Sequence, residues 1–169
     1  MMDISISVNG LQALAAGLRQ APAYTEQVLQ ATMTEATLLA QREWQENLPR
    51  VSGLTAKSIT SDVASTPAGV LGVVGSGQPS ARWIELGTEP HPVSEKGREA
   101  LAEWAVKKLG VSKKEAPGVA WLVARKIARE GTPAQHPMGR AVAATEGQIV
   151  AMFERAAGQI AEYLVQGDA

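Results

Sequence analysis

One long amphipathic segment constrains the fold of this 169-residue chain more than any other feature. Between about residues 22 and 47, apolar side chains recur every three or four positions, which is the period of one face of an α-helix. The stripe consists of Leu29, Met33, Ala36, Ala40, Trp44 and Leu48. Pro22 suits the first turn of this helix, and Pro49 ends it. A helix of about 25 residues is about 38 Å long and often spans a whole sheet face.

Shorter patterns on either side of this helix predict strands and a further helix. Residues 3–8 alternate between polar and apolar side chains, which is typical of a half-buried edge strand. Asn9 then caps a short helix over residues 11–18. Residues 58–64 and 70–74 predict two strands, and the Thr-Pro-Ala-Gly sequence between them has turn chemistry. We therefore expect a β-hairpin after the long helix.

The second half of the chain predicts helices. Residues 94–109 form one helix, and Gly110 ends it. A capping-box pattern begins at Ser112, but we place the start of the next helix at Pro117, because proline fits only the first turn. Gly131 ends that helix, so residues 94–131 form a helical hairpin, which we interpret as an insertion.

Two segments complete the pattern. A last helix is expected from about Met138 to Val165, followed by a frayed tail at 166–169. Segment 81–86 fits either a helical turn or a strand, since Trp83 and Leu86 have helical spacing in a very short stretch. The expected order is strand, long helix, hairpin and helices.

Composition excludes several classes of protein. The apolar fraction of 45% and the charged fraction of 20% are ordinary for a soluble globular protein. The chain has no cysteine, which excludes disulfides and thiolate metal sites. No apolar run approaches the roughly 18 residues of a membrane span, and residues 1–8 lack the basic region of a signal peptide.

Charge is balanced overall but uneven along the chain. The net charge is −1, yet residues 96–140 carry ten basic and four acidic side chains, while residues 1–95 carry five and nine. Four lysines lie within eight positions of the basic part: Lys107, Lys108, Lys113 and Lys114. Such a segment is a solvated helical face, a face that meets an acidic neighbouring subunit, or a surface that contacts phosphates.

Residues for catalysis or metal binding are few. The two histidines, His91 and His136, are 45 positions apart, and a metal site would need a further ligand such as Glu85 or Glu89. Glu85, between two apolar residues, is a candidate general base or a carboxylate paired with Arg82 or another chain. No nucleophile elbow or phosphate-binding loop is present. We therefore expect no enzyme activity, no cofactor and no metal.

Tryptophan is the most informative large residue type, because it anchors interfaces. Trp44 and Trp104 lie on apolar stripes and are predicted to be in the core. Trp83 lies beside loops and Trp121 lies off the stripe of its helix, so these two are candidate interface residues.

Three stretches, in order, resemble a known family. They are Ser-Gly-Leu-Thr-Ala-Lys-Ser-Ile at 52–59, Ala-Arg-Trp-Ile-Glu-Leu-Gly-Thr at 81–88, and Gly-Thr-Pro-Ala-Gln-His-Pro-Met at 131–138. Together they resemble the tail-component, or tail-completion, proteins of lambda-like long-tailed phages and prophages. The resemblance covers about residues 8–165. Members often have an aromatic residue after the second proline of the third stretch, where this chain has Met138.

The resemblance implies an α+β fold, in which long N-terminal and C-terminal helices pack on a small antiparallel sheet. It implies one domain over residues 1–169 and a structural role in the virion neck, assembled in the host cytoplasm. It implies that further copies of the chain, commonly six, form a ring around the DNA channel. The axial neighbours of that ring would be connector or head-closure proteins and tail-tube or tail-terminator proteins. DNA is then only cargo, with no membrane and no small-molecule substrate.

Two interface hypotheses follow. One seam between subunits would contain Trp83, Glu85, Thr88, Pro137 and Met138, and the basic hairpin would meet an acidic surface of a neighbour. The alternative function is a DNA-binding accessory protein that uses the basic hairpin at 96–129. A third possibility is a small hydrolase that uses Glu85 with His91 or His136.

Overall fold

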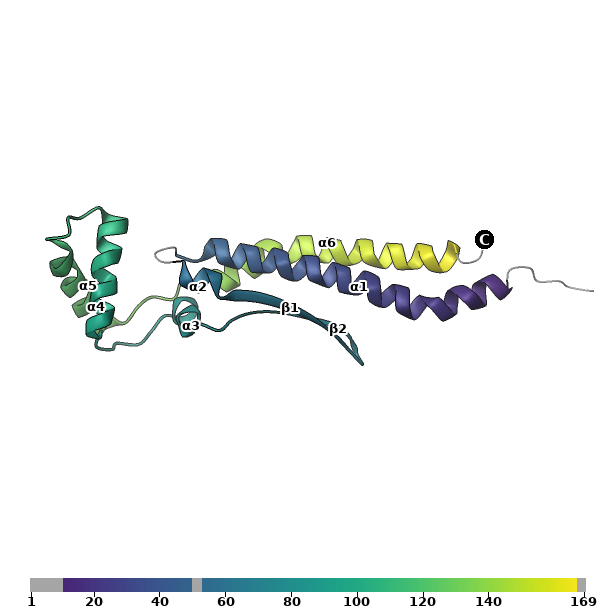
Figure 1. The fold of residues 1–169 in the computed structure, drawn as a ribbon, viewed down its shortest axis with the longest axis horizontal. Coiled ribbons are helices and arrows are strands. Elements are labelled where there is room, and N and C mark those ends of the chain that lie inside the picture. The colour runs from purple at the N-terminus through teal and green to yellow at the C-terminus, as the bar shows by residue number, and fades with distance from the viewer. Residues whose placement is uncertain (1–10, 50–52, 167–169) are drawn as a thin grey trace, which may run out of the picture. The chain divides into compact units, whose positions relative to one another are not determined.

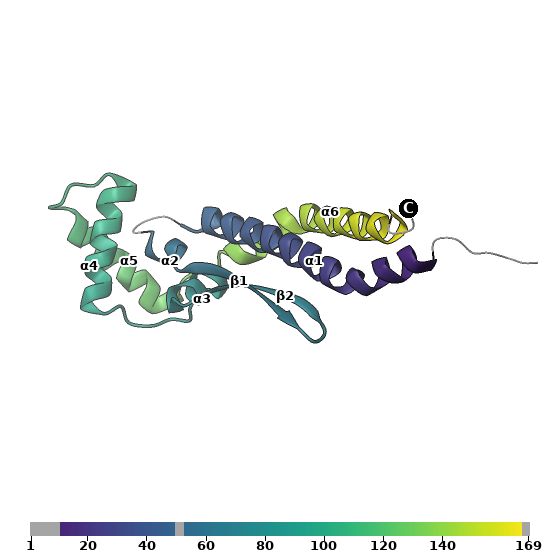
Figure 2. The same ribbon diagram turned by 45° about the vertical axis from the view of Figure 1, so that its right-hand side comes forward.

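The α+β class is confirmed. The structure, a computed structural model, describes residues 11–49 and 53–166, so the predicted strand at 3–8 lies outside the described residues. Along the chain, long helices come first and last, and a two-stranded sheet and shorter helices come between them in the sequence (Figures 1 and 2). In chain order the elements are α1 (Leu11–Asn47), α2 (Leu54–Lys57), β1 (Ile59–Thr66), β2 (Gly69–Ser76), α3 (Pro79–Leu86), α4 (Glu95–Trp104), the π-helical turn η1 (Ala105–Leu109), α5 (Ala116–Glu130) and α6 (Pro137–Gln166).

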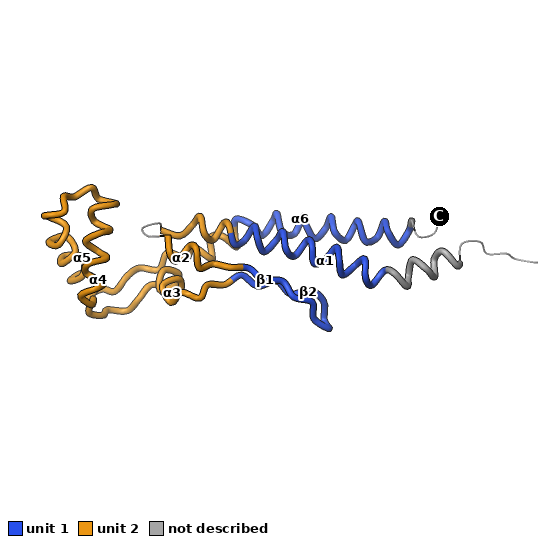
Figure 3. The backbone as a smooth tube through the Cα atoms, in the orientation of Figure 1, with its two compact units in different colours: residues 1–41, 61–74, 144–169 blue, residues 42–60, 75–143 orange. Residues whose placement is uncertain are grey.

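The chain divides into two compact units, shown in different colours in Figure 3. Unit 1 contains residues 1–41, 61–74 and 144–169, and unit 2 contains residues 42–60 and 75–143. Each unit thus combines segments that are far apart in the sequence. The single-domain organisation stays a prediction.

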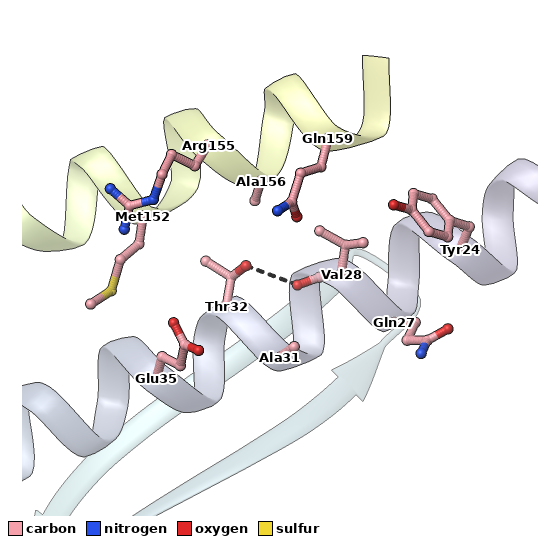
Figure 4. A pocket seen from close by; sticks show the side chains of 10 residues that line it. All are labelled: Tyr24, Gln27, Val28, Ala31, Thr32, Glu35, Met152, Arg155, Ala156 and Gln159. Atoms are coloured by element: carbon pink, nitrogen blue, oxygen red, sulfur yellow. Dashed lines mark hydrogen bonds between the residues drawn. The ribbon is translucent and has the colours of Figure 1, made fainter. Parts of the chain in front are cut away.

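In unit 1, the long helices α1 and α6 lie side by side. The rings of Tyr24 on α1 and Tyr163 on α6 stack, with centroids 3.9 Å apart and planes inclined by 15°. A crevice of about 260 Å³ separates the two helices, and Figure 4 shows the side chains that line it. In this crevice the Thr32 hydroxyl donates a hydrogen bond of 2.9 Å to the carbonyl of Val28 in the preceding turn. The helices therefore pack through a mixture of aromatic, small and polar side chains.

The β-hairpin packs on another part of α1. A carbon placed on Gly72 of β2 would lie 2.5 Å from Thr37 Cγ2 and 2.6 Å from Met33 Sδ, so only glycine leaves room for this helix. Nearer the turn, Ser65 donates to Glu26 (2.6 Å) and accepts from Gln30 (2.6 Å). The predicted hairpin is confirmed, with each strand somewhat longer than the pattern indicated.

Small residues dominate the buried apolar positions. Among the described residues, most buried apolar side chains are alanines: Ala36, Ala81, Ala105, Ala116, Ala120, Ala124, Ala141 and Ala156. Alanine lets helices approach closely, but each one removes little apolar area from water. Many large apolar side chains are left exposed, among them Trp83 and Leu86 on α3 and Met138 in the first turn of α6.

The prediction of a helix break at Pro22 is wrong. A single 37-residue helix, α1, runs through this position. Proline lacks an N–H and disturbs one turn, but its fixed φ is compatible with a helix. Because proline removes only one main-chain hydrogen bond of the helix, the helix can continue through this position, and the residues that follow pack on α6, beginning with Tyr24 against Tyr163.

The helical hairpin of unit 2 is confirmed. The N-cap of α4 is Ser94, whose hydroxyl accepts from Gly97 N at 3.2 Å, and Gly110 follows η1 with φ of 68°. The segment 81–86 is helical, within α3, and the sequence patterns did not predict the short helix α2. The capping box at Ser112 forms as well, although α5 itself begins at Ala116.

Candidate functional site

Glu85 at the end of α3 caps the first turn of α6. Its carboxylate accepts hydrogen bonds from Met138 N (2.7 Å) and Gly139 N (3.1 Å), and its carbonyl accepts from His136 N (3.3 Å). Pro137 has no N–H, and Arg140 N donates to the carbonyl of His136 at 2.9 Å, so Glu85 supplies the acceptors for the N–H groups of that turn that have none within the helix. The second and third family-like stretches therefore meet within one chain.

Two Gly-Thr dipeptides form a bridge next to this cap. Thr88 and Thr132 form an antiparallel bridge, with N–H to O distances of 3.0 and 3.1 Å, and their hydroxyls lie 2.9 Å apart. Gly87 and Gly131 precede the two threonines, and each has φ of 73°. Glycine adopts this conformation readily because it has no Cβ. A carbon on Gly131 would lie 1.9 Å from the Thr88 carbonyl oxygen, and one on Gly87 would lie 2.4 Å from that of Thr132. The bridge closes the base of the helical hairpin.

The first family-like stretch, residues 52–59, bonds to α3 and β2. Its contacts, together with the Glu85 cap and the bridge of Thr88 and Thr132, are called the framework below. The Thr55 hydroxyl lies 2.9 Å from that of Ser80 on α3, and the Ser58 hydroxyl lies 2.7 Å from that of Ser76 on β2. Ser58 also donates to the carbonyl of Thr55 at 2.7 Å, which ends α2. All three stretches thus hold α3 in place.

Arg140 is a framework residue that sequence reasoning missed. Its guanidinium donates to the carbonyl of Asn47, the last residue of α1, at 3.1 Å and to the carbonyl of Gln135 at 2.6 Å. Both acceptors are main-chain oxygens without a sequence signature. A basic residue near the start of a helix was the only signal available.

The predicted seam residues have different surroundings. Pro137 is fully buried. Glu85 accepts a hydrogen bond from Met138 N, and Thr88 pairs with Thr132, all within the same chain. By contrast, Trp83 is 57% exposed and Met138 is also exposed, so these two are available to a partner.

Exposed apolar side chains gather around a groove next to the framework. Leu86 and Met138 line this groove of about 480 Å³, together with the buried ring of Trp44. Within the described part of the chain, the Trp44 indole N–H has no acceptor. Apolar exposure of this kind is typical of a surface that contacts another protein.

The basic hairpin carries a second candidate surface. Lys107, Lys108, Lys113 and Lys114 are all exposed, and of these only Lys107 forms an ion pair among the described residues, with Glu103 at 3.6 Å. On α5, the Arg125 guanidinium lies 5.0 Å from the ring centre of Trp121, which is exposed as predicted. The hairpin therefore offers unpaired positive charge and one aromatic surface.

The histidines do not form a catalytic or metal cluster. His136 Nδ1 lies 3.9 Å from Glu85 Oε1, whereas His91 Nδ1 contacts the carbonyl of Glu89 at 2.8 Å. Both Glu85 oxygens already accept main-chain hydrogen bonds, which leaves this carboxylate poorly placed to act as a general base. Among the described residues, no three histidine or acidic side chains lie close enough together to hold a metal ion.

Comparisons with known proteins add no relative. The chain matched no protein-family model, no curated protein and no solved structure. In the described part of the chain, none of the helices combines the length and apolar character needed to cross a membrane.

Proposed function

We propose that this chain is a structural subunit of the neck of a long-tailed phage, where it completes the tail or joins it to the head. Copies would assemble as a ring, with six favoured, around the channel through which DNA passes. The axial neighbours would be connector or head-closure proteins and tail-tube or tail-terminator proteins. The chain would act in the virion by contact alone, with no cofactor and no reaction.

One observation carries this proposal: the three family-like stretches build a single framework. Glu85 caps α6, and the paired dipeptides at Thr88 and Thr132 close the hairpin base. Glu85, Thr88 and Thr132 already form hydrogen bonds within their own chain, so they do not need to touch a partner. They fix α3 and the start of α6, whose exposed residues Trp83, Leu86 and Met138 are then the contact residues.

The basic hairpin supplies the second contact. Its lysines are exposed and mostly unpaired, whereas the rest of the chain is acidic. A head-to-tail ring brings unlike surfaces of neighbouring copies together, so opposite charges can meet at every junction.

Native mass spectrometry and electron microscopy of the purified chain test the ring directly. Trp83→Ala should dissociate the ring while leaving the monomer's unfolding free energy nearly unchanged, because this side chain is exposed. Leu38→Ala, which removes a similarly exposed side chain from α1, is the control and should leave the ring intact. A ring that survives Trp83→Ala with only a lower melting temperature would show that Trp83 stabilises the fold of its own chain and does not hold the ring together.

Charge reversal tests the basic surface. Changing Lys107, Lys108, Lys113 and Lys114 to glutamate should weaken ring or neck assembly. The same four changes to glutamine should have an intermediate effect, because they remove attraction without adding repulsion. Unchanged assembly of the glutamate variant at physiological salt would show that the hairpin makes no such contact.

The same exposed lysines favour one alternative, a DNA-binding accessory protein. Binding to phosphates releases counterions, so its affinity falls steeply with salt. A duplex titration at two salt concentrations separates the functions: steep loss of binding supports the alternative, and no binding at low salt removes it.

A further inference from the structure

The helical hairpin contains an apolar pocket near the connection between its two helices. The pocket has a volume of about 300 Å³, and its apolar lining consists of Ala102, Val106, Ala116 and Pro117. Val106 belongs to the π-helical turn η1, and π-helical turns are rare overall but common at functional sites. The pocket is therefore suited to take up an apolar side chain of a partner.

Positive charge predominates at the mouth of this pocket. Lys107 and Lys113 are exposed and also line it. Lys107 lies 3.6 Å from Glu103, a third charged lining residue, whereas Lys113 forms no ion pair among the described residues. Lys108 and Lys114 are the next residues in the sequence, and both are exposed. A partner that fits this pocket therefore combines an apolar side chain with acidic neighbours.

One exposed side chain of this same sequence has such neighbours. Val150 on α6 is 52% exposed, and Glu146 and Glu154 precede and follow it by four positions each. Residues four positions apart are neighbours on one face of a helix, so Val150 lies between two carboxylates. Both glutamates are exposed, and neither forms an ion pair within the described part of the chain. Of the exposed large apolar side chains on the described helices, Val150 is the only one with an acidic residue at both of these positions.

The surroundings of Val150 allow another chain to approach closely. Gly147 lies about one turn before it, and a carbon added to this glycine would face open space. Arg155, the one basic residue between positions 144 and 166, lines the crevice between α1 and α6 (Figure 4). The face of α6 that carries Val150 is therefore open and negatively charged.

We propose that α6 of a second copy docks on this pocket, with the side chain of Val150 inside it. Glu146 and Glu154 then lie beside the lysines at its mouth. This inference rests on the part of the proposed function in which the basic hairpin meets an acidic surface of another copy, and it names that surface. Every copy offers both the pocket and the α6 face, so the junction is head-to-tail and can repeat from copy to copy.

Charge reversal on each surface, followed by mixing, tests the pairing. One full-length variant carries Glu146→Lys and Glu154→Lys, and the other carries Lys107→Glu and Lys113→Glu. Analytical ultracentrifugation measures association over a range of protein concentrations. Circular dichroism shows whether each variant retains its helices, as we expect because all four side chains are exposed.

Each variant alone should need at least about tenfold more protein to associate, because like charges would meet at the junction. The mixture should associate like the parent chain, because the two reversed surfaces match each other and the two unchanged surfaces still match. Glu89→Lys with Glu162→Lys is the control. It changes the net charge by the same amount as the reversal on α6, at two other exposed positions, and should associate like the parent.

The apolar part of the junction is tested separately. Val150→Ser should weaken association about tenfold, because burying a valine accounts for roughly that step in affinity. Val165→Ser, at a 72% exposed position of the same helix, is the control and should have no effect. Because the chain has no cysteine, Val150→Cys and Val106→Cys each give a protein with a single thiol. A short bismaleimide should link these two proteins in a mixture, and it should not link Val165→Cys to Val106→Cys.

Three results would overturn the proposal. If Glu146→Lys with Glu154→Lys associates like the parent, α6 is not the occupant of the pocket, while the proposed ring survives on other contacts. A mixture that does not recover would show that the two surfaces do not meet. A parent chain that stays monomeric at every concentration would contradict both the docking and the ring. Recovery in the mixture, with dimers or open chains in place of closed rings, would support the docking and contradict the ring.

Discussion

Thr88 and Thr132, 44 positions apart in the sequence, face each other in one antiparallel bridge. The chain therefore leaves for the helical hairpin and returns from it at the same point. Because each threonine follows a glycine with positive φ, the two main chains approach more closely than side chains at these glycine positions would allow. The bridge and the neighbouring Glu85 cap hold the hairpin base and the start of α6.

Gly131→Ala should destabilise unit 2 by about 3 kcal/mol. At φ of 73° and ψ of −159° an alanine is strained by about 1–3 kcal/mol, and the new carbon would collide with the Thr88 carbonyl, so both hydrogen bonds of the bridge would weaken. Urea unfolding measures the loss. Gly118→Ala on α5 is the control, because nothing lies within 4 Å of the added carbon there, and it should be neutral or raise stability by about 0.5 kcal/mol. Equal effects of the two changes would contradict the role of the bridge.

Glu85→Ala should lower the unfolding free energy by about 2 kcal/mol, because it removes a charged cap that accepts two main-chain hydrogen bonds. The side chain is only 13% exposed, so water replaces these bonds poorly. Glu85→Gln should cost about half as much, because one acceptor oxygen remains. Glu89→Ala, four positions away and exposed, is the control in the same urea titration and should change stability by less than about 0.5 kcal/mol. A Glu85→Ala protein as stable as this control would show that the cap is dispensable.

Local patterns in the sequence predicted the elements well. The stripe from Leu29 to Leu48 marked the long helix, and Gly110 and Gly131 marked ends of the helical hairpin correctly, because periodicity and stop signals act within a few residues. Pro22 misled because a local preference for the first turn does not exclude a place inside a helix, where proline removes only one main-chain hydrogen bond.

The framework could be predicted only in part. Glu85, Thr88, Pro137 and Met138 were selected together as a seam between copies, and that seam stays a prediction. The cap from Glu85 to Met138 and the bridge from Thr88 to Thr132, both within the chain, were not predicted. Arg140 was missed because its acceptors are main-chain oxygens, one of them 93 positions away. The repeated Gly-Thr dipeptide was the one signal of the bridge, but it does not by itself indicate pairing.

Gly72→Ala should loosen the hairpin from α1. The added carbon would lie 2.5 Å from Thr37 Cγ2 and 2.6 Å from Met33 Sδ, and Thr37 is buried, so we expect a loss of about 1–3 kcal/mol. Thr37→Ser removes the colliding methyl group but keeps the hydroxyl that donates to Thr34.

The double variant should therefore recover part of this loss, with a coupling energy of about 0.5 kcal/mol or more in a double-mutant cycle. Gly75→Ala, which has open space around it, should be tolerated better than Gly72→Ala. Strict additivity of Gly72→Ala and Thr37→Ser would mean that the two positions do not touch.

The capping box before α5 should make that helix sensitive to acid. Ser112 donates through its hydroxyl (2.6 Å) and its main-chain N–H (3.2 Å) to the Glu115 carboxylate, and these bonds lower the pKa of Glu115 from its ordinary value of 4.5. Since the folded pKa is lower than the unfolded one, the stabilisation is fully present above about pH 4.5. It is lost as the pH falls through the folded pKa.

Glu115→Gln should therefore speed hydrogen exchange in the first turn of α5 at pH 6, and the difference from the parent chain should shrink below pH 4. The comparison is made between variant and parent at each pH, because general acid effects act on both. Glu99→Gln on α4 is the control, and its difference from the parent should not follow this pattern. A Glu115→Gln difference that stays constant from pH 6 to pH 3 would show that the ionised carboxylate does not hold the cap.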